Sequence, residues 1–144
     1  MTGYKKVFID TAPFIYFIEK NEDNPEYFGK VKNFLMECYD KRKSFFTSVI
    51  TIEEYLVAPY KKGECCYIET FKKLLKTLGF NVMNINKEIA EKAAMIRAEY
   101  KGFKAMDALQ LATAYVTGCD LFLTNDKQLK QFREIRCIIL DELE

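Results

Sequence analysis

Residues 7–18 read VFIDTAPFIYFI, and this stretch joins a strand to a helix. Residues 7–9 form a short apolar run of β-favouring side chains, which stops at Asp10. After Pro13, the apolar residues 14–18 favour a helix that begins near this proline. A strand that leads into a helix in this way is the repeating unit of the α/β class.

The rest of the chain repeats this alternation. Beyond the break at 21–25, helical spacing of apolar residues predicts helices over residues 28–38, from 52 to a break or bend at 59–63, and over 68–78, 89–100, 105–116 and, as a short helix, 126–132. Short β-rich runs predict strands over residues 45–49, 80–85, 121–123 and 135–140, before an acidic tail at 141–144.

Strands that alternate with helices form a mostly parallel sheet, because parallel strands need crossover connections and right-handed crossovers place helices on the faces of the sheet. We therefore predict a three-layer α/β/α fold with about five strands. In such folds, ligands bind beyond the carboxyl ends of the strands, near the point where the strand order reverses. Asp10 and Asp126 each follow a predicted strand, so we expect both at this edge.

The composition fits one domain that spans residues 1–144. The chain is 49% hydrophobic, which is enough for a sizeable core. Its 22 basic and 21 acidic side chains leave a formal charge of +1, so any nucleic-acid binding has to use a local patch. The chain contains no histidine, so hydrolytic chemistry would have to use carboxylates and the cations that they hold.

The cysteine pattern indicates a reducing cytosol. The five cysteines are odd in number, include the adjacent pair Cys65 and Cys66, and show no Cys-x-x-Cys spacing, which argues against a disulfide framework and against a zinc cluster. No apolar run reaches the ~18 residues that span a bilayer, so we expect neither a membrane anchor nor a signal peptide.

Four segments place a carboxylate near the end of a strand or the start of a helix. They read VFIDT at 7–11, SVITIEE at 48–54, DALQLATA at 107–114 and LFLTND at 121–126. In this order and at these separations they resemble a PIN-domain ribonuclease, of the small VapC type that is the toxin of VapBC toxin–antitoxin pairs. The resemblance covers nearly the whole chain and implies the PIN-like α/β/α fold.

The resemblance also implies an activity. In the family, acids at the positions of Asp10, Glu54, Asp107 and Asp126 bind one or two divalent ions, usually Mg²⁺ or Mn²⁺, and the enzymes cut RNA. A cognate antitoxin and a homodimer are further expectations from the resemblance. The family also includes RNA-processing nucleases outside toxin–antitoxin pairs and inactive relatives, and the presence of all four acids argues against an inactive one.

The residue types suit this chemistry on physical grounds. Mg²⁺ and Mn²⁺ are hard cations that prefer carboxylate oxygen and water as ligands. A bound ion makes its water easier to deprotonate and neutralises charge that builds up on phosphoryl oxygens. A phosphodiester can therefore be hydrolysed without histidine.

Each carboxylate also has a purely structural explanation. Asp10 suits the turn after its strand, and Thr51 and Glu54 have the Thr-x-x-Glu spacing of a capping box. Asp107 and Asp126 fall where helices begin, and the helix dipole favours negative charge there. If the four acids lie close together in space, a metal site is favoured over these structural roles, because carboxylates gathered without a cation repel one another and raise one another's pKa.

Two of the acids have competitors nearby in the sequence. Glu53 lies beside the apolar stripe of its helix, whereas Glu54 points away from it and could line an open cleft, which favours Glu54 mildly. The family pattern also selects Glu54. Asp120 competes with Asp126 but begins the strand whose other end faces the predicted site, so we prefer Asp126.

Other polar residues are expected to support the site or to have ordinary structural roles. Thr11, Thr124 and Asn125 could orient ligands or waters, and they are also common turn residues. Three basic residues could hold an RNA backbone or simply form a charged helix face: Lys127, Lys130 and Arg133.

A second interpretation is a non-catalytic signalling or binding domain of the phosphoacceptor kind. Asp10 would lie near a phosphorylated carboxylate, Thr124 would act as the switch, and Lys127 would be the charge partner. This interpretation explains less of the chain, because it assigns no role to Glu54 or Asp107.

Overall fold

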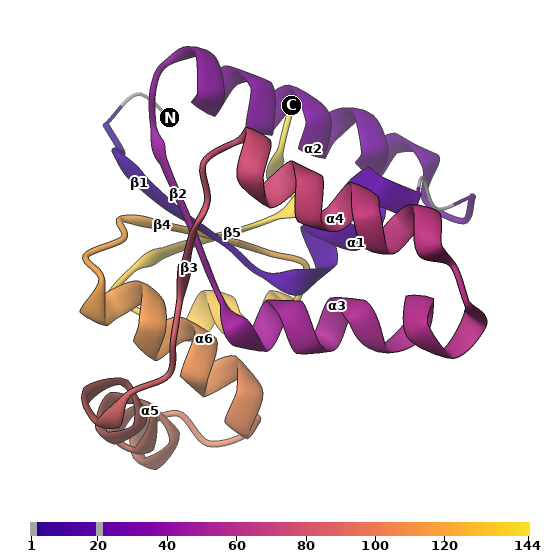
Figure 1. Ribbon diagram of the computed structural model, residues 1–144. Coiled ribbons are helices and arrows are strands. Elements are labelled where there is room, and N and C mark those ends of the chain that lie inside the picture. The colour runs from indigo at the N-terminus through magenta and orange to yellow at the C-terminus, as the bar shows by residue number, and fades with distance from the viewer. Residues whose placement is uncertain (1–2, 20–21) are drawn as a thin grey trace.

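Figure 1 shows the computed structural model, which describes residues 3–19 and 22–144. Its five strands are β1 (Lys6–Ile9), β2 (Ser44–Ser48), β3 (Asn81–Met83), β4 (Leu121–Thr124) and β5 (Arg136–Ile139). They form one sheet in the order β3-β2-β1-β4-β5, and every neighbouring pair is parallel. This confirms the predicted fold class.

Helices cover both faces of this sheet (Figure 1). The described α-helices are α1 (Thr11–Glu19), α2 (Pro25–Asp40), α3 (Val49–Lys62), α4 (Cys65–Thr77), α5 (Lys87–Glu99) and α6 (Ala105–Val116). Two short 3₁₀ helices follow, η1 (Lys127–Gln131) and η2 (Leu140–Glu142). Helices α1 to α4 pack on one face of the sheet, and α5 and α6 pack on the other.

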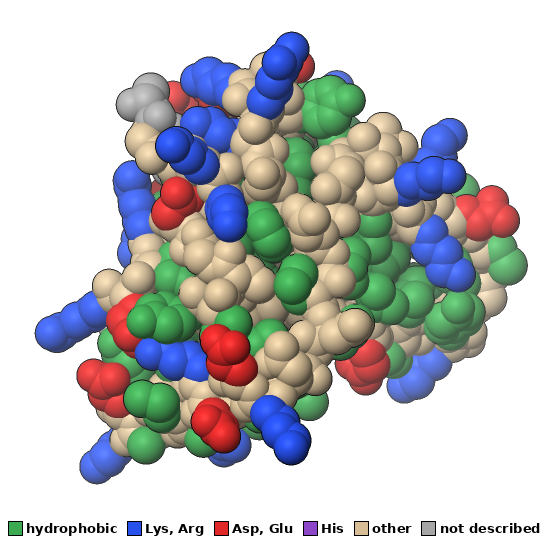
Figure 2. All heavy atoms as spheres, turned by 60° about the vertical axis from the view of Figure 1, so that its left-hand side comes forward, with side chains coloured by type: hydrophobic (Ala, Val, Ile, Leu, Met, Phe, Trp, Pro, Cys, Tyr) green, Lys and Arg blue, Asp and Glu red, His purple; other side chains and the backbone are tan. Residues whose placement is uncertain are grey.

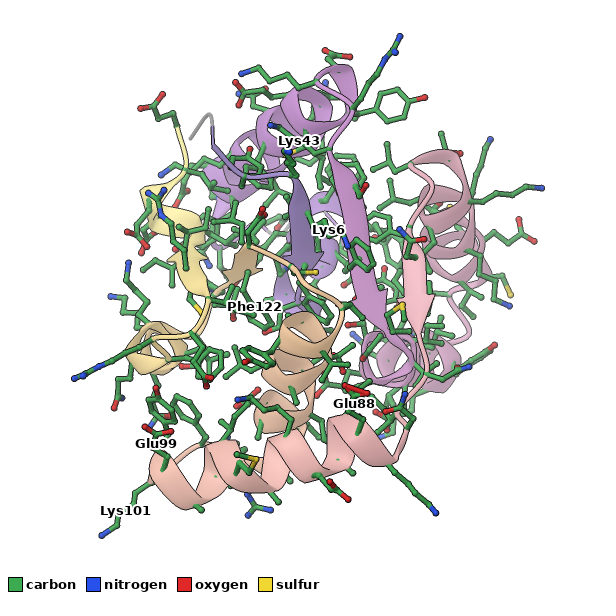
Figure 3. The ribbon with its side chains drawn as sticks, turned by 90° about the vertical axis from the view of Figure 1, so that its left-hand side faces the viewer. Lys6, Lys43, Glu88, Glu99, Lys101 and Phe122 are labelled. Carbon is green, nitrogen blue, oxygen red and sulfur yellow. The ribbon has the colours of Figure 1, made fainter. Side chains whose placement is uncertain are left out.

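Side chains alternate along each central strand and so build two separate cores. Val7 and Ile9 point into the core beneath α1 to α4, whereas Phe8 points into the core beneath α5 and α6. Phe122 of β4 lies on this second face (Figure 3) and stacks on Phe8, with the ring centroids 5.1 Å apart. Burial on both faces explains why these strands read as continuous apolar runs in the sequence.

The structure differs from the sequence prediction at the junction of β2 and α3. Val49 was predicted to end the strand, but it is the first residue of α3. Ser48 is the N-cap of this helix, and its hydroxyl accepts a hydrogen bond from the Ile50 amide at 3.1 Å. The capping-box reading of Thr51 and Glu54 is therefore wrong, because both residues lie inside the helix.

The predicted end of this helix at 59–63 is confirmed. Helix α3 continues through Pro59 to Lys62, and its C-cap is Gly63, whose φ of 67° is a left-handed conformation that glycine adopts readily. The segment after Asp126 is a 3₁₀ helix with Asp126 as its N-cap. Of the break predicted at 21–25, Asn21 lies outside the described residues.

The molecular surface carries both signs of charge. Figure 2 shows basic and acidic side chains on the same face, which agrees with the formal charge of +1. All five cysteines are free thiols, and Cys65 and Cys66 are the exposed pair. Among the described residues, none of the helices is both long and apolar enough to cross a bilayer.

Candidate functional site

The strand order reverses between β1 and β4, and the chain places acidic residues at that point. Strands β2 and β3 extend the sheet on one side of β1, and β4 and β5 extend it on the other. The Asp10 amide donates to the carbonyl of Leu123 at 2.9 Å, which fixes the end of β1 against the end of β4. This is the position at which open α/β sheets bind ligands.

Asp10 lies at the bottom of the candidate site. It is 9% exposed, and its two carboxylate oxygens accept hydrogen bonds from the Thr124 hydroxyl at 2.9 Å and the Gln110 amide at 3.3 Å. Burial raises the pKa of Asp10 to about 6, against the lowering effect of the Thr11 and Thr124 hydrogen bonds, and the charges of Asp107 and Glu54 raise the pKa further. The carboxylate is therefore a buried charge.

Glu54 reaches the same place from α3. It is exposed, and its Oε1 accepts a hydrogen bond of 2.6 Å from the hydroxyl of Thr11, the residue that follows Asp10. Its charge adds to burial in raising the pKa of both Asp10 and Asp107, so it lies within electrostatic range of both carboxylates. Glu53 is also exposed, but no hydrogen bond or ion pair links it to these groups in the described chain.

Asp107 and Asp126 come from the last third of the chain. Asp107 lies in the first turn of α6, and burial together with the nearby charges of Asp126 and Glu54 raises its pKa, while Lys104 lowers it. Asp126 caps η1, because its Oδ1 accepts a hydrogen bond of 3.0 Å from the Gln128 amide. The structural reading of Asp126 as a cap is thus correct, and the charge of the same side chain also raises the pKa of Asp107.

The four carboxylates share one edge without forming a closed cluster. Within residues 3–19 and 22–144, no three acidic or cysteine side chains lie close enough together to hold an ion as they stand. In the same residues, no lysine or arginine forms an ion pair with any of the four acids. An all-oxygen set that carries unpaired, partly buried negative charge is chemically suited to a hard divalent cation.

The sequence analysis missed Gln110 as a residue of this site. Its amide is fully buried and bonds Asp10, Thr51 and Ser48. One signal was present: Gln110 lies three residues after Asp107 and so on the same face of α6, and it is a polar residue inside an apolar run. Its burial could not be read from the sequence.

Asp120 is not part of this edge. Its carboxylate accepts hydrogen bonds from the backbone amides of Lys5 and Lys6 at 3.0 to 3.1 Å, so it ties the start of β4 to the start of β1. It lies at the opposite end of the sheet from Asp126, whose amide donates to Thr124 at 3.1 Å. Asp126 is therefore the member of this pair whose charge acts on Asp107.

The basic residues after Asp126 have mixed surroundings. Lys127 is exposed at the start of η1, beside the acidic edge. Lys130 forms an ion pair with Glu142, and the backbone amide of Arg133 donates to the Tyr100 hydroxyl at 3.2 Å. Among the three, Lys127 is thus the best placed to meet a phosphate near the carboxylates.

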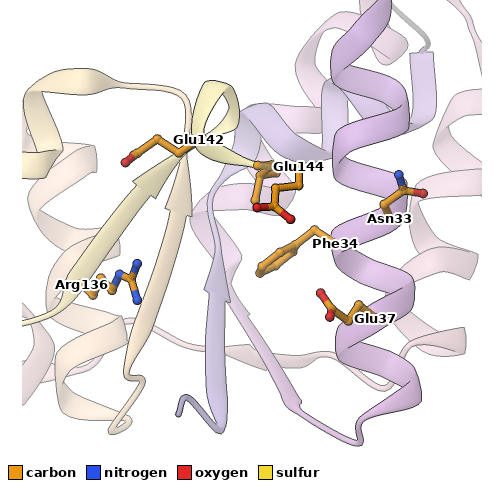
Figure 4. Close-up of a pocket in the computed structure, with 7 residues that line it drawn as sticks. Asn33, Phe34, Glu37, Arg136, Glu142 and Glu144 are labelled. Atoms are coloured by element: carbon orange, nitrogen blue, oxygen red, sulfur yellow. The ribbon is translucent and has the colours of Figure 1, made fainter. Parts of the chain in front are cut away.

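A separate cavity lies elsewhere on the molecule. Figure 4 shows a pocket of about 320 Å³ between α2 and the edge strand β5, where Glu37, Arg136 and Glu142 lie around it. None of the four carboxylates lines this pocket.

A comparison with protein families identifies the fold. The family model described as the PIN domain matches residues 7–135. The chain belongs to the PIN domain family. A search of curated protein sequences finds no match.

Solved structures of PIN proteins resemble this chain over most of its length. A chain of a toxin–antitoxin complex from Klebsiella pneumoniae is 25% identical, with a TM-score of 0.70 and coverage of 90% of this chain and 94% of that one. VapBC2 from Rickettsia felis, bound to a DNA fragment from its promoter, is 16% identical, with a TM-score of 0.76 and coverage of 93% and 98%.

A third relative is VapC20 from Mycobacterium tuberculosis, described as a toxin that cleaves the sarcin–ricin loop. It is 16% identical, with a TM-score of 0.63 and coverage of 90% and 98%. The PIN chain thus has the fold of VapC-type toxins. Its strand order also differs from the 2-1-3-4-5 order of phosphoacceptor domains, so that second interpretation is set aside.

Proposed function

We propose that this PIN-domain protein is a divalent-metal-dependent endoribonuclease and the toxin of a toxin–antitoxin pair. One observation carries the proposal: Asp10, Glu54, Asp107 and Asp126, from distant parts of the chain, share the edge at the strand-order reversal. Burial raises the pKa of Asp10 and Asp107 there, and the charges of neighbouring members of the set raise both further. Buried like charges are unfavourable in a purely structural role. A site for a cation explains why they are together.

The four carboxylates would hold Mg²⁺ or Mn²⁺ and are the proposed catalytic set. When bound, such an ion supplies a water that is easier to deprotonate and stabilises charge on the phosphoryl oxygens. Thr124 holds one oxygen of Asp10, and Thr11 holds one oxygen of Glu54, so both acids are oriented before any ligand arrives. Glu54 is the most exposed of the four, so a ligand from solvent can reach the edge on the side of Glu54.

RNA is the proposed substrate, and a cognate antitoxin is the proposed partner. VapC20 is a toxin that cleaves the sarcin–ricin loop, the Klebsiella structure is a toxin–antitoxin complex, and the Rickettsia structure is VapBC2. We extend both properties to this chain as part of the proposal, together with a homodimer and a reducing cytosol, in which five free cysteines are stable.

The direct test is RNA cleavage by the purified protein. Labelled RNA is incubated with the protein in Mn²⁺, in Mg²⁺ and in excess EDTA. We expect internal cleavage with either ion and none with EDTA. Cleavage that persists in EDTA, or no cleavage of any RNA in either ion, would contradict the nuclease proposal.

A separate test addresses the toxin assignment. Induced expression of the chain alone is expected to stop growth, and co-expression of its proposed cognate antitoxin is expected to restore growth. Normal growth during expression of an active nuclease would favour RNA processing outside a toxin–antitoxin pair.

Glu54→Gln and Glu53→Gln form a matched pair of variants. Glu54→Gln removes a negative charge that faces Asp10 and Asp107, so we expect cleavage to fall by at least about 10- to 100-fold. Glu53→Gln removes the neighbouring exposed charge and is expected to leave the rate within about twofold. The initial rate of cleavage at fixed Mn²⁺ measures both, and equal rates for the two variants would exclude Glu54 from the site.

A further inference from the structure

Gln110 occupies a position in α6 where an amide side chain is unusual. It is 1% exposed, and its helix neighbours Ala108, Leu111 and Ala112 are fully buried apolar residues. A buried amide destabilises the fold unless its polar atoms are hydrogen-bonded. Whether Gln110 stabilises or destabilises the fold therefore depends on its hydrogen bonds.

Every contact of this amide leads to the carboxylate edge. Its Oε1 accepts from the Ser48 hydroxyl, and its Nε2 donates to Thr51 Oγ1 at 2.7 Å and to Asp10 Oδ1 at 3.3 Å. Both amide hydrogens have acceptors, and the carbonyl oxygen has a donor. The side chain thus joins β1, the start of α3 and α6 at one point.

These bonds continue into a closed ring. The Thr51 hydroxyl lies 2.8 Å from the Thr47 hydroxyl, which donates to the carbonyl of Ile9 at 2.8 Å. Ile9 is the residue before Asp10, so the path returns to the strand end from which it started. We call Thr47, Ser48, Thr51 and Gln110 the Gln110 network; all four side chains are at most 1% exposed.

The Gln110 network lies one helical turn beneath two of the proposed ligands. Thr51 precedes Glu54 by three residues on α3, and Gln110 follows Asp107 by three residues on α6. A bond between Thr51 and Gln110 therefore fixes the starts of the two helices relative to each other. The bond from Gln110 Nε2 to Asp10 Oδ1 fixes both helix starts relative to Asp10.

We propose that Gln110 is a positioning residue for the metal-binding carboxylates, an inference that rests on the proposed function. It orients the Asp10 carboxylate and sets the spacing between Glu54 and Asp107 through the helices that carry them. Thr124 holds the other oxygen of Asp10 from β4, so the two contacts prevent this carboxylate from rotating. Groups that orient a metal ligand typically change affinity or activity by about 10- to 100-fold when they are removed.

Gln110→Met tests this role, because methionine has a similar length but donates no hydrogen bond. The matched control is Thr113→Val, which removes a buried hydroxyl from the same helix; that hydroxyl donates only to Leu109 O, at 2.7 Å. Mn²⁺ affinity, measured by electron paramagnetic resonance of the free ion, is the readout that does not depend on cleavage. Circular dichroism checks that each variant is folded.

We expect Gln110→Met to bind Mn²⁺ about 10- to 100-fold more weakly and to cut RNA more slowly even at saturating Mn²⁺, while Thr113→Val matches the wild type in both. Equal Mn²⁺ affinity in Gln110→Met and Thr113→Val would overturn the inference and leave the nuclease proposal standing. If the wild type cuts no RNA but Gln110→Met still binds Mn²⁺ more weakly than Thr113→Val, the role of Gln110 stands and the nuclease proposal is wrong.

A second variant covers the case in which Gln110→Met does not fold. Thr51→Val opens the same ring with a side chain of nearly the same shape. It is expected to weaken Mn²⁺ binding in the same direction, and unchanged affinity in a folded Thr51→Val protein would overturn the inference.

Discussion

Asp10→Asn is expected to abolish RNA cleavage and, in the absence of metal, to make the protein more stable. The loss of activity follows because asparagine is a poorer ligand than a carboxylate at the centre of the proposed site. We expect the cleavage rate to fall by at least about 100-fold, beyond the usual effect of removing a group that only orients a ligand. The gain in stability follows from the buried charge.

The sign of the stability effect comes from the pKa of Asp10. This pKa is raised to about 6 in the folded protein, from an ordinary value near 4, so the folded state binds more protons than the unfolded state between these pH values. Stability of the metal-free wild type therefore falls as the pH rises through this window. Above pH 6 the buried charge destabilises the fold by up to about 3 kcal/mol.

Urea unfolding of the metal-free wild type and Asp10→Asn between pH 4 and pH 7.5 measures this effect. The variant should be more stable by roughly 1 to 3 kcal/mol above pH 6, and the difference should shrink toward pH 4. Asp40→Asn, which removes an exposed carboxylate at the end of α2, serves as the control and should change neither activity nor the pH dependence. An Asp10→Asn protein that still cuts RNA, or a stability difference from the wild type that stays the same from pH 4 to pH 7.5, would count against the assigned role of Asp10.

Mn²⁺ is expected to raise the unfolding temperature of the wild type, and more strongly at pH 7.5 than at pH 5. Binding to the folded state alone at 100 times the dissociation constant contributes about 2.7 kcal/mol. For a chain of this size that corresponds to roughly 5 to 10 °C. At pH 5 the increase should be smaller, because protons compete with the ion at Asp10 and Asp107, both of which have raised pKa values.

Thermal scans at the two pH values, with Mn²⁺ or with EDTA, measure this dependence. Asp107→Asn is the control that should lose most of the increase, since it removes one proposed ligand while Asp10 stays in place. The same increase at both pH values, or in Asp107→Asn, would show that Mn²⁺ binds elsewhere on the protein.

The sequence predicted the strands and helices of this fold better than the residues at which one element ends and the next begins. Strands buried on both faces are largely apolar runs, so β1 and β4 could be found from their local sequence. The start of α3 could not, because Val49 and Ile50 are β-branched and read as strand residues. The hydroxyl of Ser48 caps the helix there, and a cap of this kind outweighs the weak preference of the residues that follow.

For the candidate site, the sequence predicted four acids, whose role stays a prediction, and it did not predict the buried residue that contacts Asp10. The order and spacing of the four acidic segments pointed to Asp10, Glu54, Asp107 and Asp126. Gln110 was not predicted, because its hydrogen-bond partners Ser48 and Asp10 lie 62 and 100 residues away in the sequence. Their contact depends on the sheet order, which no local pattern contains.

The central position of β1 has a consequence for how the protein is made. Strand β1 pairs with β2 on one side and with β4 on the other, and the Asp10 amide bonds Leu123 of β4. The acidic edge is therefore complete only after the last third of the chain, with Asp107 and Asp126, has been synthesised. A ribosome that has reached only α5 carries a chain with half of the proposed ligands. On the proposed function, the nascent chain cannot cut RNA until its last strands have emerged from the ribosome.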